Sequence, residues 1–167
     1  MQGAQAMSVN MTAVSQPIVD AGDVLTLNYY CQDTAFQVRP ATSVPGQLAA
    51  IVALAGDRPV VFQELGCPAG IAPSVLGASP SAQAAFFHAV FAEMDTRPQL
   101  RAAFAFQVVD WSPTLAAQFA NAYRAAGFPA LADAVQESLA SMGLVEYATG
   151  QPRGAWAELL AAAARFR

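Results

Sequence analysis

The chain has 167 residues, of which 55% are hydrophobic and 12% are charged, so it can bury one sizeable core, and we expect a single domain spanning 1–167. All 8 basic residues are arginines, against 12 acidic residues, and the net charge is -4. No basic stripe remains for a phosphate backbone, which argues against nucleic acid as a partner.

The first half of the chain alternates short apolar runs with longer helical patterns. Strand candidates are 7–14 (MSVNMTAV), 23–30 (DVLTLNYY) and 58–66 (RPVVFQELG), the last rich in β-branched residues. Between the second and third lies a helical pattern over 44–56 that ends at a glycine. A second helix is predicted over 79–95, where a serine N-cap precedes a proline in the first turn.

The second half repeats this order. An apolar run over 102–110 (AAFAFQVVD) is a further strand candidate, and helices are predicted over 114–127, 129–141 and 152–165. Strands that alternate with helices favour parallel βαβ units and an α/β fold. Apolar stretches all fall short of the roughly 18 residues that cross a bilayer, and the first 14 residues do not form a secretory signal, so we expect no membrane partner.

Two architectures accommodate about four parallel strands. An open doubly wound sheet is one, but the glycine-rich nucleotide fingerprint that usually follows its first strand is absent. The other is a (β/α)8 TIM barrel, which normally needs about 250 residues. The sequence therefore predicts roughly half of such a barrel, with intervening and C-terminal helices.

Cys31 and Cys67 each follow a strand candidate. Two cysteines and one histidine lack the spacing of a zinc site, so we expect no metal and no cofactor. Two unpaired thiols are the favoured interpretation, and a single disulfide stays open.

Five segments resemble, in this order, the C-terminal half of the clan A (β/α)8-barrel glycoside hydrolases, and they equate the four strand candidates with barrel strands five to eight. The endo-β-glucanase and galactanase-like members are the most similar. The segments are DVLTLNYY, RPVVFQELGCPAG, SAQAAFFHAVF, FAFQVVDWSP and GLVEYATGQPRGAW.

The resemblance implies a retaining glycosidase that hydrolyses β-linked oligosaccharides or polysaccharides. Glu64 matches the nucleophile, and alternation along the strand is expected to place Val60, Phe62 and Glu64 on one inward face. The proton donor of this clan is a glutamate after an asparagine on strand four, and the chain contains no such pair. We therefore expect this chain to be inactive alone, either as a fragment or in need of an N-terminal half-barrel. Localisation stays open, with an extracellular or periplasmic site compatible with a full-length parent.

The strand before Glu64 supplies further candidate site residues. Alternation puts Thr26, Asn28 and Tyr30 on one face, with Tyr29 turned toward the helices. In the resembling families, a tyrosine at the position of Tyr30 orients the nucleophile and keeps it ionised. Asn28 and Tyr30 are therefore expected to contact substrate.

Trp111 and Asp110 follow the last strand candidate. An indole face suits the apolar face of a sugar ring, so Trp111 is a candidate stacking platform. Asp110 is a candidate for binding a sugar hydroxyl.

Three alternatives remain open. Glu64 is a structural acid if it caps a turn or pairs with Arg58. In the second alternative, the chain is a non-catalytic half-barrel module for carbohydrate binding or self-association. In the third alternative, an open α/β enzyme unrelated to sugars uses Glu64 and Asp110 as a carboxylate pair.

Overall fold

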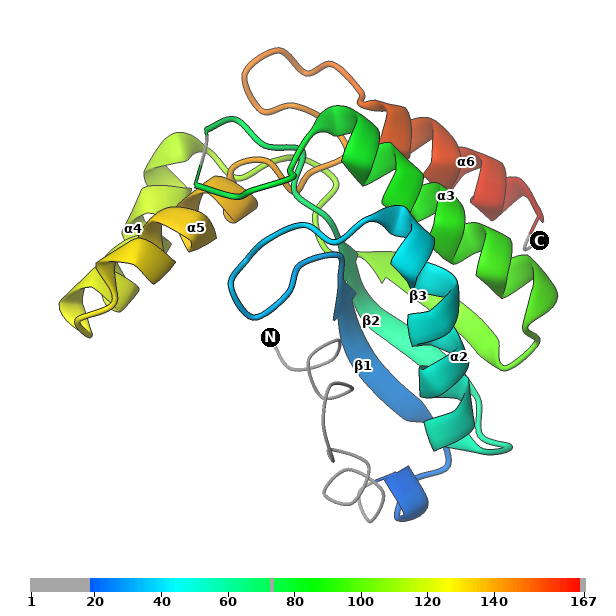
Figure 1. Ribbon diagram of the computed structural model, residues 1–167. Coiled ribbons are helices and arrows are strands. Elements are labelled where there is room, and N and C mark those ends of the chain that lie inside the picture. The colour runs from blue at the N-terminus through cyan, green and yellow to red at the C-terminus, as the bar shows by residue number, and fades with distance from the viewer. Residues whose placement is uncertain (1–18, 73, 166–167) are drawn as a thin grey trace.

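The computed structural model describes residues 19–72 and 74–165, and their strands form one parallel sheet in the order β1-β2-β3 (Figure 1). The strands are β1 (Leu25–Tyr30), β2 (Val60–Gly66) and β3 (Leu100–Ala105). Both neighbouring pairs are parallel, as the alternation of strands and helices predicts. The candidate strand at 7–14 lies outside the described residues.

The strand predicted over 102–110 differs from the observed strand at both ends. The observed strand β3 begins earlier, at Leu100, and it ends earlier, at Ala105. Its neighbour β2 ends at Gly66, so the backbone beyond Phe106 finds other partners. Val108 accepts hydrogen bonds from the amides of Leu144 and Val145, and the amide of Asp110 donates to Val145. Residues 108–110 thus pair with the segment that precedes the last helix.

Three helices cover one face of the sheet, whereas two others form a hairpin that projects beyond the ends of the strands (Figure 1). Ser79 and Ser112 cap two of the helices, accepting from the amides of Ala82 and Leu115. The covering helices are α2 (Val44–Ala55), preceded by the 3-10 turn η1 (Ala41–Ser43), α3 (Pro80–Thr96) and α6 (Gly154–Arg165), and the hairpin is α4 (Pro113–Ala125) and α5 (Pro129–Leu139). These bounds agree with the predicted helices to within two residues.

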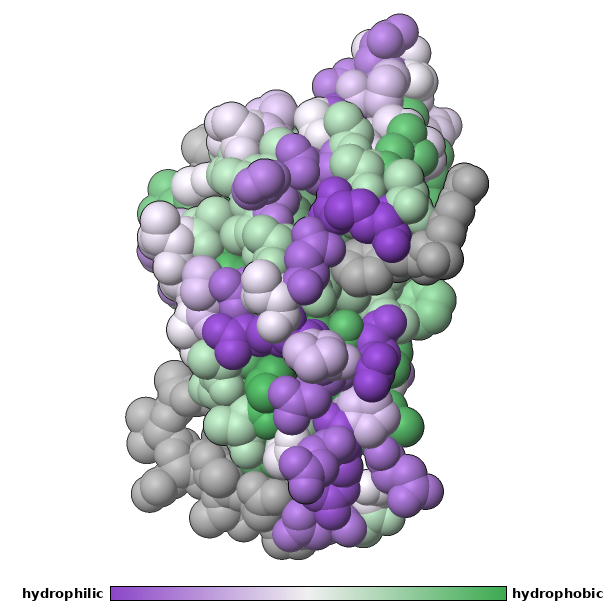
Figure 2. Space-filling model, turned by 90° about the vertical axis from the view of Figure 1, so that its right-hand side faces the viewer, coloured by the Kyte–Doolittle hydropathy of each residue, from purple (hydrophilic) through white to green (hydrophobic). Residues whose placement is uncertain are grey.

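The main core lies between the sheet and the three covering helices. Tyr29 is fully buried there and packs against Phe62 of β2 and Phe86 of α3, with ring centroids 5.4 Å apart in both pairs. Figure 2 looks at the molecule from a side on which hydrophilic residues are interspersed with small hydrophobic areas. A second, smaller core joins α4 and α5; its buried members are Ala116, Val135, Leu139 and Ala140.

A β-bulge in β2 overturns the prediction that Val60, Phe62 and Glu64 share one face. Leu27 pairs with Phe62 and Asn28 with Glu64, so Gln63 is an extra residue in β2 without a partner in β1. The side-chain alternation therefore reverses at Gln63. Val60, Phe62 and Leu65 belong to the helix-side core, whereas Glu64 lies on the opposite face.

Candidate functional site

The site begins where β1 and β2 end. Tyr30 is the last residue of β1, and its phenol donates a hydrogen bond to the carboxylate of Glu64 on β2. The predicted contact between these two residues is therefore present. Tyr29 turns toward the helices, also as predicted, and its phenol donates to Gln47 of α2 at 2.8 Å.

The environment of Tyr30 keeps its phenol protonated. Burial raises the pKa of Tyr30 well above its ordinary value, and the hydrogen bond to Glu64 and the negative charge of Glu64 raise it further. A carboxylate has no proton to give, so in the hydrogen bond between the two groups the phenol is the donor. Tyr30 therefore holds one oxygen of Glu64 in a fixed direction.

Gly66 makes room for the Tyr30 ring. A Cβ at this position would lie 3.0 Å from a ring carbon of Tyr30 and 2.7 Å from the sulfur of Met142. Gly66 is also the residue that pairs with Tyr30 across the two strands. The last position of β2 thus has to be small for the phenol to reach Glu64.

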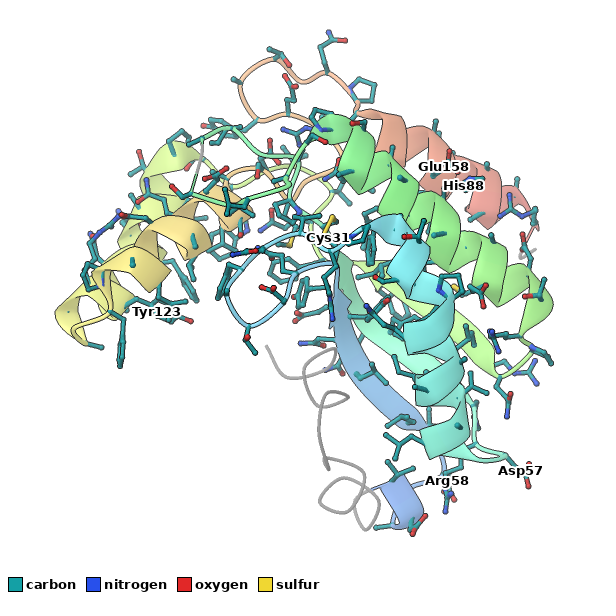
Figure 3. All side chains as sticks on the ribbon, in the orientation of Figure 1. Cys31, Asp57, Arg58, His88, Tyr123 and Glu158 are labelled. Carbon is teal, nitrogen blue, oxygen red and sulfur yellow. A yellow bond between two sulfur atoms is a disulfide. The ribbon has the colours of Figure 1, made fainter. Side chains whose placement is uncertain are left out.

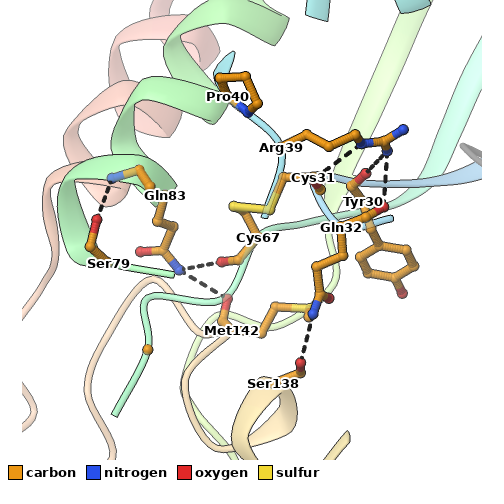
Figure 4. Close-up of a disulfide and its surroundings, with 12 residues drawn as sticks. Tyr30, Cys31, Gln32, Arg39, Pro40, Cys67, Ser79, Gln83, Ser138 and Met142 are labelled. Carbon is orange, nitrogen blue, oxygen red and sulfur yellow. Dashed lines mark hydrogen bonds between the residues drawn. A yellow bond between two sulfur atoms is a disulfide. The ribbon is translucent and has the colours of Figure 1, made fainter. Parts of the chain in front are cut away.

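Arg39 fixes the backbone that follows Tyr30 (Figure 4). Its guanidinium donates to the carbonyl oxygens of Tyr30 at 3.2 Å and Gln32 at 2.9 Å. These carbonyls lie where β1 leaves the sheet and loses its strand partner. The contacts fix the backbone at the end of β1, from which the Tyr30 phenol reaches Glu64.

Cys31 and Cys67 form a disulfide, which corrects the favoured interpretation of two unpaired thiols (Figure 4). Cys31 directly follows β1 and Cys67 directly follows β2, and their Cα atoms are 5.2 Å apart. Parallel neighbours bring equivalent strand ends together, so the two residues can bond. The bond ties the two strands together one residue beyond Tyr30.

A cleft of about 290 Å³ opens beside Tyr30 and Glu64. The strand ends form one side of it, and the α4–α5 hairpin forms the other. Figure 3 labels a residue from each part, Cys31 next to the end of β1 and Tyr123 on the hairpin. The lining is largely aromatic and aliphatic: Asn28, Tyr30, Gln32, Phe36, Glu64, Phe106, Phe119, Tyr123, Val135, Ser138, Leu139 and Met142.

Phe36 reaches the cleft from a strained backbone conformation. Its φ is 60°, in the left-handed region that bulky residues rarely adopt. The carboxylate of Asp33 stabilises this turn by accepting from the amides of Ala35 and Gln37, both at 2.9 Å. Backbone strain of this kind concentrates at ligand-binding sites, and here it lies on the wall of the cleft.

Asn28 lies in the cleft beside Glu64, its partner across the two strands. Of the predicted site residues, the structure thus brings together Asn28, Tyr30 and Glu64. Thr26 is exposed on the same strand and does not line the cleft.

Asp110 lies outside the cleft in a buried ion pair. Its carboxylate accepts two hydrogen bonds from Arg153, at 2.8 and 2.7 Å, and a third from the amide of Gly143 at 2.8 Å. The side chains of Arg153 and Asp110 are only 6% and 4% exposed. The contacts hold the segment before α6 against the chain that follows β3, and they occupy the oxygens that were predicted to bind a sugar.

Trp111 is not part of the cleft lining. It packs behind Phe119 of α4, with ring centroids 5.6 Å apart and nearly perpendicular planes. Phe119 and Tyr123 present their rings to the cleft instead, and sequence reasoning missed both. Their spacing of four residues on α4 places them on one helix face, which was the available signal.

The alternative in which Arg58 neutralises Glu64 has no support in the described contacts. Arg58 lies at the start of β2, where it pairs with Asp20 at 3.5 Å and donates to the carbonyl oxygen of Gly22 at 2.8 Å. Glu64 lies near the other end of the strand and accepts a hydrogen bond from Tyr30.

The described residues contain no group of three or more His, Cys, Asp or Glu side chains placed to hold a metal. None of their helices is long and apolar enough to cross a membrane.

No protein-family model matches the chain, and no curated protein matches it either. Among solved structures, it is similar to an active-site mutant of the β-1,3-glucanosyltransferase of Rhizomucor miehei in complex with laminaritriose. The TM-score is 0.51 and the sequence identity 16%, over 83% of this chain and 44% of the other. At this identity the likeness shows the fold alone: the open α/β sheet matches part of a TIM-barrel glycosidase, and the chain spans less than half of that neighbour.

Proposed function

We propose that the chain is the C-terminal half-barrel of a retaining enzyme that cleaves or transfers β-linked glycans, with Glu64 as the nucleophile. The observation that carries the proposal is the hydrogen bond from Tyr30 to Glu64 at the carboxyl ends of adjacent parallel strands. Active sites of barrel enzymes lie at this end of the strands.

In the first chemical step, a Glu64 oxygen attacks the anomeric carbon, and the bond from that carbon to the leaving group breaks. The leaving group departs with the electron pair, and an ester joins Glu64 to the sugar. Water, or the hydroxyl of a second sugar, then attacks the same carbon and releases Glu64 as a carboxylate, while the group that protonated the leaving group takes up the proton of the attacking hydroxyl. Tyr30 leaves one Glu64 oxygen free to attack by donating to the other.

The proposed substrate is a β-linked glucan. The aromatic wall formed by Phe106, Phe119 and Tyr123 offers ring faces to the apolar faces of pyranoses. The neighbour of similar fold was solved with laminaritriose, a β-linked glucan fragment. A β-1,3-linked oligosaccharide is therefore the first ligand to test.

Among the described residues that line the cleft, Glu64 is the only carboxylate. We assign the proton donor to the other half of the barrel. A good leaving group such as fluoride departs without protonation. The attack by Glu64 can therefore be tested on this chain alone.

The test uses 2-deoxy-2-fluoro-β-laminaribiosyl fluoride. We expect it to esterify Glu64, seen as a mass increase of the protein and located by peptide mapping, with release of one fluoride. Glu64→Gln should abolish labelling, whereas Glu158→Gln, the same substitution on α6, should leave it intact. A protein that stays unlabelled, or is labelled elsewhere, would show that Glu64 is not the nucleophile.

A non-catalytic carbohydrate-binding half-barrel is the second candidate. It is favoured by the same observation that Glu64 has no second carboxylate across the described cleft. Binding of laminaritriose with no labelling of Glu64 would support it.

A further inference from the structure

Asn28 stands next to Glu64 on the open face of the sheet. The two residues pair across β1 and β2, and both side chains line the cleft. Tyr30, two residues further along β1, lies on the same face and is engaged with Glu64. The amide of Asn28 is therefore one of the few polar groups in an otherwise largely apolar cleft.

The side-chain oxygen of Asn28 is buried and has no hydrogen-bond partner. A buried acceptor without a partner destabilises the folded protein and calls for an explanation. Gln83 also has an unpartnered oxygen, but its nitrogen donates to the carbonyls of Cys67, Met142 and Gly143, which anchor it in the core. Asn28 differs because its unpartnered oxygen belongs to a side chain that lines the cleft.

We propose that the Asn28 amide turns when a sugar binds, so that its side-chain oxygen accepts a hydrogen bond from a hydroxyl group of the sugar that Glu64 attacks. Asn28 is then a specificity-determining residue, and the inference rests on the proposed function. The Glu64 carboxylate is likewise an acceptor, so a ligand beside both groups has to bring donors. A sugar ring with adjacent hydroxyl groups meets this requirement.

This role predicts selectivity against sugars that lack the hydroxyl. A site built to hydrogen-bond a hydroxyl rejects an analogue without it, because the acceptor is then left unpaired in the complex. We expect the wild-type protein to bind one monodeoxy analogue of laminaritriose roughly 10-fold more weakly than laminaritriose itself.

Asn28→Leu tests the proposal in the protein itself. Leucine has nearly the shape of asparagine and removes the unpaired oxygen, so the midpoint of thermal unfolding should rise. The same change should weaken laminaritriose binding, followed by intrinsic fluorescence, roughly 10-fold. Thr26→Val, on the same strand face but outside the cleft, should leave the affinity unchanged.

The monodeoxy analogue completes a double-mutant cycle. Once its partner hydroxyl is absent, Asn28→Leu should cost no further affinity. A variant that melts at a lower temperature and binds every analogue proportionally more weakly would assign Asn28 a merely structural role and overturn the proposal. If Asn28→Leu fails to fold, the proposal is tested by the affinities of the wild-type protein for laminaritriose and its monodeoxy analogues. Equal affinity for laminaritriose and all of these analogues would overturn the proposal.

The outcomes also separate this inference from the proposed function. Labelling of Glu64 together with unchanged laminaritriose affinity in Asn28→Leu would remove the role of Asn28 and leave the function standing. If the wild-type protein is not labelled and does not bind laminaritriose, the proposed function fails, and the inference fails with it.

Discussion

Tyr29 and Tyr30 are neighbours in sequence with opposite surroundings, because successive side chains of a strand point to opposite faces. The phenol of Tyr29 donates a hydrogen bond to Gln47 of α2, and the phenol of Tyr30 donates one to Glu64 in the cleft. The same chemical change at the two positions therefore separates packing from function.

Tyr30→Phe should slow the labelling of Glu64 roughly 10- to 100-fold, because a hydrogen bond to a charged group contributes about 1.5–3 kcal/mol. Tyr29→Phe is the matched control. It should leave the labelling rate unchanged and lower the free energy of unfolding by about 1 kcal/mol through the lost bond to Gln47. Rates followed by mass spectrometry and urea unfolding curves measure both effects. Equal rates in wild type and Tyr30→Phe would contradict the orienting role.

Asp110→Asn should lower the free energy of unfolding by about 3–5 kcal/mol, because Arg153 would be left buried without a counter-charge. Asp133→Asn is the control, since Asp133 pairs with Arg124 at 2.6 Å but is 59% exposed. It should change stability by about 0–1 kcal/mol. Similar losses in the two variants, measured by urea unfolding, would show that burial of the Asp110 pair is energetically unimportant.

At the scale of elements, the disulfide connects the ends of β1 and β2 and closes a loop with a sequence separation of 36. Replacing both cysteines by serine should lower the free energy of unfolding by about 4 kcal/mol, since the unfolded chain regains the entropy of the open loop. Reduction of the wild-type protein should match the double variant in a urea titration. A loss below about 1 kcal/mol would mean that the sheet and helices hold these ends without help.

The α4–α5 hairpin rests on its own small core, whereas α3 packs in the main core. Elements with few buried apolar contacts open at lower free energy. Amide hydrogens of α4 should therefore exchange faster than those of α3, as measured by hydrogen–deuterium exchange. Laminaritriose should slow the exchange of α4, because Phe119 and Tyr123 line the cleft. Equal protection of the two helices in the free protein would contradict a separate hairpin core.

Element types were readable from the sequence where a local signal existed. Serine caps, prolines in first turns and Gly56 marked helix bounds well, and apolar runs marked the strands. The end of β3 was not readable, because it depends on where β2 stops. The ion pair of Asp110 was also hidden, since its partner Arg153 lies 43 residues away.

For the molecule as a whole, we expect Tyr29 and Tyr30 to make the stability of the fold depend on pH in the alkaline range. Burial raises the pKa of Tyr29 and Tyr30 above the ordinary value of 10.0, so the folded protein keeps protons that the unfolded chain releases. Stability contributed by these protons is complete below pH 10 and is lost as the pH rises further. Urea unfolding at pH 8 and above pH 10 should show this loss, and Tyr30→Phe should reduce it. An identical pH dependence in the variant would contradict the prediction.

The overall architecture was predicted only as far as its local periodicity allowed. Parallel strands and covering helices follow from the alternation of patterns, and the shared face of Asn28 and Tyr30 follows from strand geometry. The cleft was not predictable, because one wall comes from a hairpin more than 80 residues after β1. Whether the chain completes a barrel with another half stays a prediction.

The extra residue Gln63 divides β2 into two stretches with separate duties. Val60 and Phe62 anchor the strand in the core, while the residues after the bulge deliver Glu64 to the cleft. If Gln63 were paired regularly in place of the bulge, strict alternation from Phe62 would turn Glu64 toward the helices and Leu65 toward the cleft, without changing any amino acid. The face on which the Glu64 carboxylate lies thus depends on the backbone geometry at one residue as much as on the identity of the side chains.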